Sequence, residues 1–142
     1  MLAAADAVGA VPVSVLHDMV TGVLQFVMRE LLPHAELEDR VLYAAVEKVL
    51  ESPRAADTMR REHDEVGRTA QELSDLLGSL ASGDELPDRL ARDLRRVLYG
   101  IHAVLSLHFA KEEHVYLPLL AGGLSATEQT LVLADLVSHA HH

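Results

Sequence analysis

The sequence predicts an all-α fold, and three observations support this prediction. Leucine, alanine and valine dominate the apolar residues, with 25, 19 and 16 of the 142 positions, whereas isoleucine occurs once and tryptophan is absent. Leucine and alanine are strong helix formers, while strands favour isoleucine, threonine and aromatic residues. Apolar residues also recur at spacings of three and four, and no useful length of the chain alternates with the period of two that strands require.

Two long helical patterns occupy the first half of the chain. Pro12 can lie in the first turn of a helix whose apolar positions continue to Val49. Ser52 can act as the N-cap of the next helix, with Pro53 at its first position. Spacings of four and three then alternate from residue 59 to residue 80, which is typical of a narrow apolar seam that faces a bundle core.

Two further helices are predicted after a loop at residues 81–84. Pro87 can begin a long helix that is apolar on nearly all sides in its middle, and Pro118 and the glycines at 122–123 end it. The sequence from Ser125 to Glu128 then forms a capping-box pattern before a short final helix.

Size and charge restrict the class of protein. A chain of 142 residues, 49% of them apolar, can bury the core of one domain, which we expect over residues 1–138 with a mobile histidine-rich tail at 139–142. The formal charge of −10 argues against a nucleic-acid surface. No apolar run approaches the roughly 20 residues of a membrane span, and no basic segment precedes the first apolar stretch, so we predict no signal peptide and a cytoplasmic protein.

One pattern, histidine followed by acids at the fourth and fifth positions, occurs twice. It lies at residues 34–39 and at residues 108–113, and in both places valine, an aromatic residue and leucine follow. On a helix, residues i and i+4 share one face, so each histidine lies beside the first acid of its pattern. Both pairs fall in the apolar seams, as does His63 in the intervening helix.

These residues are candidate metal ligands. A buried, unpaired carboxylate costs several kcal/mol, so two carboxylates and three histidines aimed at one bundle axis require a shared cation. Nitrogen and oxygen donors without sulfur suit iron, manganese or zinc, and histidines on facing helices with two carboxylates form a two-metal arrangement. The chain has no cysteine to contribute a thiolate. The predicted ligands are His34, Glu38, His63, His108 and Glu112.

The motifs resemble those of hemerythrin-like (HHE cation-binding) domains over about residues 23–120. The resemblance rests on residues 34–43, on Glu62-His63 and on residues 108–118. It implies an up-and-down four-helix bundle that holds two non-haem irons, with the three histidines as terminal ligands and the two glutamates as bridges. Glu113 is the alternative to Glu112, because some members use the acid one position later.

The sequence departs from the family at its first helix, which would supply a further histidine. Residues 1–10 suggest only a truncated first helix, and His17 is the candidate replacement. Along a continuous helix His17 would lie about 25 Å from His34, so it reaches the site only if Thr21-Gly22 forms a turn. The short first helix would also expose an apolar seam, from which we predict a homodimer.

The heights of two ligands impose a geometric condition. His34 lies about 16 residues before the end of its predicted helix and His63 about 10 residues into the next, a mismatch of roughly 9 Å. The helix that holds His34 must therefore end early, near residues 45–48. Tyr43 and Tyr116 are expected in the core or beside the ligands.

The resemblance implies that the irons bind dioxygen, nitric oxide or peroxide, for sensing, iron handling or detoxification. Manganese and zinc are alternative metals. The motifs contain no evident dedicated acid or nucleophile, so no catalytic residue is assigned, although a diiron centre can react with oxygen or peroxide. The alternative function is a metal-poor interaction module that dimerises through the seam left open by the short first helix.

Overall fold

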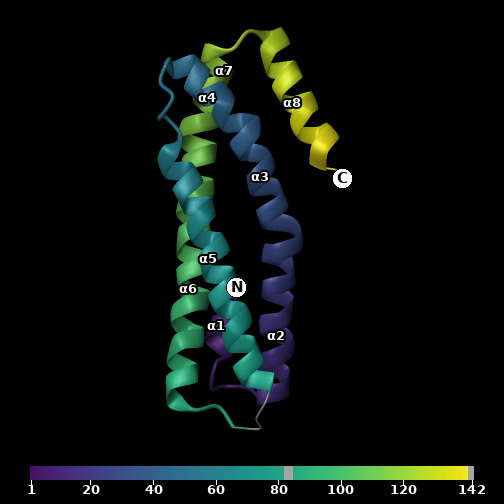
Figure 1. Cartoon of the computed structure of the whole chain (residues 1–142), viewed down its shortest axis with the longest axis vertical. Coiled ribbons are helices and arrows are strands. Elements are labelled where there is room, and N and C mark those ends of the chain that lie inside the picture. Colours follow the sequence, from purple (N-terminus) through teal and green to yellow (C-terminus); the bar gives the residue numbers. More distant parts are fainter. Residues whose placement is uncertain (82–84, 141–142) are drawn as a thin grey trace. The chain divides into compact units, whose positions relative to one another are not determined.

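The described chain is helical and contains no strand, which confirms the predicted all-α class. The computed structural model describes the backbone of residues 1–81 and 85–140, and the side chains of these residues except 81 and 135–140. The helices are α1 (Leu2–Ala7), α2 (Val13–Phe26), α3 (Leu32–Arg40), α4 (Leu42–Leu50), α5 (Asp57–Ala81), α6 (Asp88–Lys111), α7 (Leu117–Gly123) and α8 (Ala126–Ala140), with π-helical turns η1 (Val27–Leu31) and η2 (Glu112–Tyr116) (Figure 1). Within these residues, no helix has the length and apolar character needed to cross a bilayer.

Several predicted helix ends are confirmed. Pro12 immediately precedes α2, and the carbonyl of Pro87 accepts a hydrogen bond from Ala91 in the first turn of α6. The capping box at the start of α8 is reciprocal: the Ser125 and Glu128 side chains each accept the other's backbone N–H at 3.1 Å. Positions 82–84 of the predicted loop and 141–142 of the predicted tail lie outside the described residues.

Two predicted boundaries are wrong. Ser52 and Pro53 do not begin a helix, because Glu51 adopts a left-handed conformation (φ 51°) that ends α4, and α5 begins only at Asp57. Pro118 does not end a helix either. It lies in the first turn of α7, which continues directly from η2.

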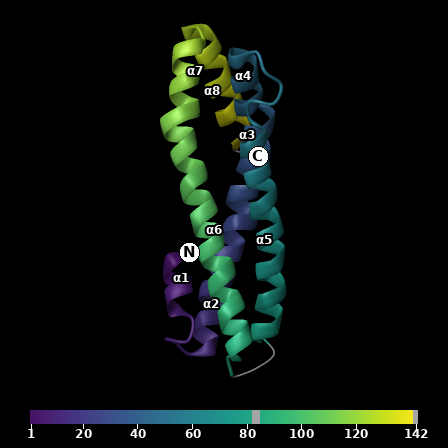
Figure 2. The same cartoon turned by 90° about the vertical axis from the view of Figure 1, so that its left-hand side faces the viewer.

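The described helices form two compact units. Unit 1 comprises Met1–Leu31 and Glu65–Leu105. In it, α1 lies beside the first part of α6 (Figure 2), where Arg95 donates to the Val8 carbonyl at 2.9 Å and Tyr99 donates to Asp6. Its fully buried apolar side chains include Leu16, Val20, Val27, Leu73, Leu94, Leu98 and Ile101.

Unit 2 comprises Leu32–Asp64 and Ser106–His142, and it contains both copies of the repeated motif. Its core forms where α4, the start of α5 and α7 meet, and α8 turns back after α7 to contact α3 and α4 (Figure 1). Arg60 of α5 donates to Glu47 and to the Asp39 carbonyl, which ties α5 to the two preceding helices. The buried core residues are Leu42, Tyr43, Val46, Ala56, Met59 and Leu120.

Candidate metal centre

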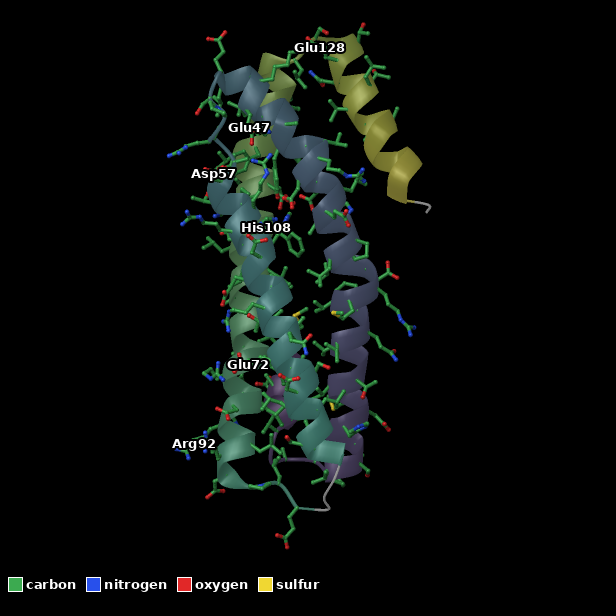
Figure 3. All side chains as sticks on the ribbon, viewed as in Figure 1. Glu47, Asp57, Glu72, Arg92, His108 and Glu128 are labelled. Atoms are coloured by element: carbon green, nitrogen blue, oxygen red, sulfur yellow. The ribbon has the colours of Figure 1, made fainter. Side chains whose placement is uncertain are left out.

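Four of the five predicted ligands converge inside unit 2. Glu38 comes from α3, His63 from α5, His108 from α6 and Glu112 from the first position of η2. Each offers one ligand atom, and these atoms all lie within 4.8 Å of one another. The two imidazole Nε2 atoms are 2.9 Å apart, and Glu112 Oε1 lies 3.0 Å from Nε2 of His108. Figure 3 shows carboxylate oxygens gathered beside the labelled His108.

Carboxylates orient both buried histidines. Nδ1 of His63 lies 3.0 Å from Asp39 Oδ1, and Nδ1 of His108 lies 3.1 Å from Glu62 Oε1. Since an ionised carboxylate only accepts hydrogen bonds, Nδ1 carries the hydrogen in both rings, and Nε2 is turned toward the cluster. Lys111 in turn donates to Glu62 and holds it in place. This carboxylate–histidine arrangement is the one that orients metal-bound imidazoles and increases their basicity.

The two buried glutamates have opposite electrostatic environments. Burial, reinforced by the neighbouring Glu112 carboxylate, raises the pKa of Glu38 from 4.5 to about 9. Burial also acts to raise the pKa of Glu112, but hydrogen bonds from His108, Glu38 and Tyr43 outweigh it and lower that pKa to about 2. Without a cation, one carboxyl of the pair is therefore protonated and the other ionised at neutral pH.

The two histidines also differ. Burial, together with the charge of His108, lowers the pKa of His63. Burial acts in the same direction on His108, but its hydrogen bonds to Glu112 and Glu62 prevail and raise its pKa. A cation at the cluster would replace these protons, since metal ligands bind in their deprotonated form.

Sequence reasoning missed the central position of Tyr43. Its hydroxyl lies 2.9 Å from Glu112 Oε1, 3.0 Å from His108 Nε2, 3.2 Å from Glu38 Oε2 and 3.3 Å from His63 Nε2. The sequence predicted that Tyr43 lies in the core or beside the ligands; its ring packs in the core and its hydroxyl lies beside all four ligand atoms, a central position that was not predicted. In a continuous regular helix Tyr43, five residues after Glu38, would point away from the ligand face, but the helix is distorted at Val41 (φ −106°, ψ −60°), between α3 and α4. Helical spacing therefore does not predict that the Tyr43 hydroxyl lies among the ligand atoms.

His34, the fifth predicted ligand, lies at the edge of the cluster. Its side chain is 54% exposed, and its Nε2 lies 3.2 Å from Glu38 Oε1. Glu38 thus directs its two oxygens to different neighbours, Oε1 to His34 and Oε2 to Tyr43. A carboxylate in this orientation can bridge two cations.

The two alternative ligands are outside the cluster. Glu113 is exposed, while Glu112 of the same motif is in the cluster. His17 belongs to unit 1, and α2 runs without interruption from Val13 to Phe26. The turn at Thr21-Gly22 that His17 required does not form.

Irregular backbone follows both motifs and changes which residues are buried. On a regular α-helix Val115, three residues after Glu112, would lie on the same buried face, but Val115 is 54% exposed. The π-helical turn from Glu112 to Tyr116 has more residues per turn than an α-helix, so the buried face is displaced and Leu120 is buried. The helix of His34 does not end near residues 45–48 as predicted: it is interrupted at residue 41 and continues as α4 to Leu50, and α5 begins later than predicted, at Asp57. His63 thereby reaches Glu38.

Comparison with curated proteins gives no match, and comparison with solved structures gives none either. Comparison with family models does identify the fold family. The model described as hemerythrin HHE cation-binding domain matches residues 2–120, which include the whole His/Glu cluster. The cluster provides two nitrogen and two oxygen donors, the set expected of a cation-binding site of this kind. The chain therefore belongs to the hemerythrin HHE cation-binding domain family.

Proposed function

We propose that this protein holds two non-haem irons in unit 2 and binds dioxygen, nitric oxide or peroxide there. The observation that carries the proposal is the convergence of two oriented imidazoles and two carboxylates within 4.8 Å. All four side chains are mostly buried, and such groups are retained in a core when they share a cation. Bound ferrous iron would supply the electrons and the open coordination positions with which small diatomic molecules or peroxide are bound.

The orientation of Glu38 supports two metal positions. Its Oε2 lies 3.2 Å from the Tyr43 hydroxyl, which also contacts His63 and His108, whereas its Oε1 lies 3.2 Å from His34. His63 and His108 would hold one iron and His34 the other, and Glu38 and Glu112 would contribute carboxylate oxygens to the pair. The protein ligands would be five for two irons, which leaves positions for a small ligand.

The exposure of the histidines supports a direction of access. His63 and His108 are buried, with 9% and 2% of their side chains exposed, whereas His34 is 54% exposed. Small molecules would therefore reach the site from the His34 side. Asp39 and Glu62 would keep the buried imidazoles oriented while ligands exchange there.

Gas binding by the iron-loaded full-length chain tests the proposal. The chain is loaded with ferrous iron under anaerobic conditions, and nitric oxide uptake is measured against protein and iron concentration. We expect saturable uptake in proportion to bound iron, and lower uptake in His63→Ala, which should lose one of the two iron positions. Stoichiometric iron without any uptake of nitric oxide, dioxygen or peroxide would overturn the small-ligand function.

A second proposal concerns self-association. Unit 2 exposes Leu107, Val115 and Leu117 by 59%, 54% and 50%, on the connected segments α6, η2 and α7. We propose that the protein forms a homodimer, and these exposed apolar side chains are candidates for the surface that the dimer would cover. Light scattering should give twice the chain mass for the wild type and a single mass for Leu107→Glu. A wild-type protein that is monomeric would contradict the proposed homodimer. A dimer that binds no iron would favour the interaction-module alternative.

A further inference from the structure

The Tyr43 hydroxyl is the common neighbour of all four ligand atoms. Four contacts of 2.9 to 3.3 Å join its oxygen to Glu38 Oε2, Glu112 Oε1, His63 Nε2 and His108 Nε2. These contacts come from α3, α5, α6 and η2, whereas Tyr43 itself belongs to α4. No other side chain in the described part of the cluster contacts all four.

Counting hydrogens shows that one phenol cannot satisfy these contacts. A tyrosine hydroxyl donates one hydrogen bond, so it can serve only one of the four atoms. Each imidazole directs its Nδ1 hydrogen at Asp39 or Glu62, outside the cluster, so that Nε2 is the atom that faces the cluster. Five atoms that can donate an electron pair to a cation, the Tyr43 oxygen included, thus surround one small region that only protons occupy when no cation is bound. A cation is the group that such a set of donors binds.

The ring of Tyr43 is held so that its hydroxyl stays in this region. The side chain is fully buried and packs in the core of unit 2 with Val46, Met59 and Leu120. The Arg60 guanidinium lies 5.8 Å from the ring centroid. To withdraw the hydroxyl, the ring would have to leave a filled core, which would cost several kcal/mol.

We propose that Tyr43 is itself a ligand of the bound metal, as a phenolate. On loading, the O–H bond of Tyr43 breaks, an oxygen–metal bond forms and the proton passes to solvent, without any change in oxidation state. The inference rests on the metal site proposed above and adds a fifth donor to the cluster. It also predicts a preference for metals that accept phenolate oxygen together with imidazole nitrogen.

The chain offers a direct test because it has only three tyrosines. In the double variant Tyr99→Phe/Tyr116→Phe, Tyr43 is the only tyrosine left. Zinc is the probe, since it undergoes no redox chemistry and has no absorption of its own. At neutral pH a free tyrosine is protonated, so a tyrosinate signal in the ultraviolet difference spectrum reports phenolate formed by metal binding. We expect the signal to rise with bound zinc and to saturate at one tyrosinate per chain.

The variant Tyr43→Phe gives the complementary result. We expect no tyrosinate signal and zinc affinity reduced roughly tenfold or more, whereas Tyr116→Phe, in the same unit, leaves both unchanged. If Tyr43→Phe does not fold, the tyrosinate signal of the variant Tyr99→Phe/Tyr116→Phe tests the inference by itself.

Equilibrium dialysis separates the two ways in which the inference can fail. Zinc bound with no tyrosinate signal in the double variant overturns the role of Tyr43 and leaves the metal site intact. No zinc or ferrous iron bound by the wild type overturns both the metal site and the phenolate ligand.

Discussion

His63 donates a hydrogen bond from Nδ1 to Asp39 Oδ1 at 3.0 Å, and this bond fixes the side of the ring that faces the metal site. The relationship links α5 to α3, which also carries Glu38. His108 of α6 has the same arrangement with Glu62 of α5 at 3.1 Å. Each buried imidazole is therefore held by a carboxylate from a different helix, and the site is oriented before any cation binds.

Removing the charge of Asp39 should weaken metal binding without removing a ligand. In Asp39→Asn the amide still reaches His63, but a neutral acceptor makes the imidazole less basic. We expect zinc or ferrous iron affinity to fall by about 10- to 100-fold, as measured by competition with a chelating dye. Glu65→Gln, at an exposed glutamate of unit 1 that pairs with Arg68, is the control and should bind as the wild type does. Equal affinities for the two variants would show that Asp39 does not tune the site.

Replacing His34 should separate the two proposed metal positions. His34 lies beside Glu38 Oε1, at 3.2 Å, while Glu38, His63, His108 and Glu112 form the buried cluster. We expect His34→Ala to lose one of two bound irons and His63→Ala to lose the position shared with His108. The number of irons that each variant retains is measured by mass spectrometry after anaerobic dialysis. Two irons retained in His34→Ala would exclude His34 as a required ligand.

The stability of the metal-free protein should fall as pH rises between about 7 and 9. The folded pKa of Glu38 is raised from 4.5 to about 9, so in this range the folded state binds a proton that the unfolded state has lost. The raised pKa of His108 acts in the same direction. The free energy of unfolding should therefore decrease by up to about 1.4 kcal/mol per pH unit for each such proton. Urea denaturation at several pH values measures the slope.

The variant Glu38→Gln isolates the contribution of that carboxyl, because the amide does not titrate. Above pH 7 the free energy of unfolding of Glu38→Gln should decrease less per pH unit than that of the wild type. His63 does not affect the pH dependence of the free energy of unfolding between pH 7 and 9, because its lowered pKa adds stability only as pH rises toward 6.5. A wild-type stability that rises between pH 7 and 9 would contradict the assignment of a protonated Glu38.

The core beneath the site should be sensitive to truncation. Met59 is fully buried and packs against Tyr43 in unit 2, whereas Met28 is 51% exposed. We expect Met59→Ala to lower the free energy of unfolding by about 2–5 kcal/mol, and Met28→Ala by less than about 1 kcal/mol. Urea denaturation of the metal-free variants compares them. Similar losses in both would mean that the core is not packed as described.

The sequence predicted the ligand cluster wherever regular helical geometry applies. His108 and Glu112 share a face because four residues separate them, and His63 was found from its place in an apolar seam. The same rule does not hold beyond a break in the helix. Neither the interruption at Val41 nor the π-helical turn at residues 112–116 has a residue type that marks it, such as proline or glycine at its start.

These two irregularities account for most of what the sequence did not predict. The first brings the Tyr43 hydroxyl among the ligands, and the second turns Val115 outward. The start of α5 was misplaced for a different reason: Ser52 and Pro53 suit a helix N-terminus, but Glu51 ends the preceding helix in a left-handed conformation and the chain needs five more residues to turn.

Iron stoichiometry tests the central claim most directly. The terminal histidines at 139, 141 and 142 are replaced by alanine to remove nonspecific binding, and the full-length chain is titrated anaerobically with ferrous iron. We predict two tightly bound irons per chain, lost together in Glu38→Ala because Glu38 would bridge both positions. Absence of tight iron in the parent chain, or equal iron in Glu38→Ala, would contradict the proposed diiron site.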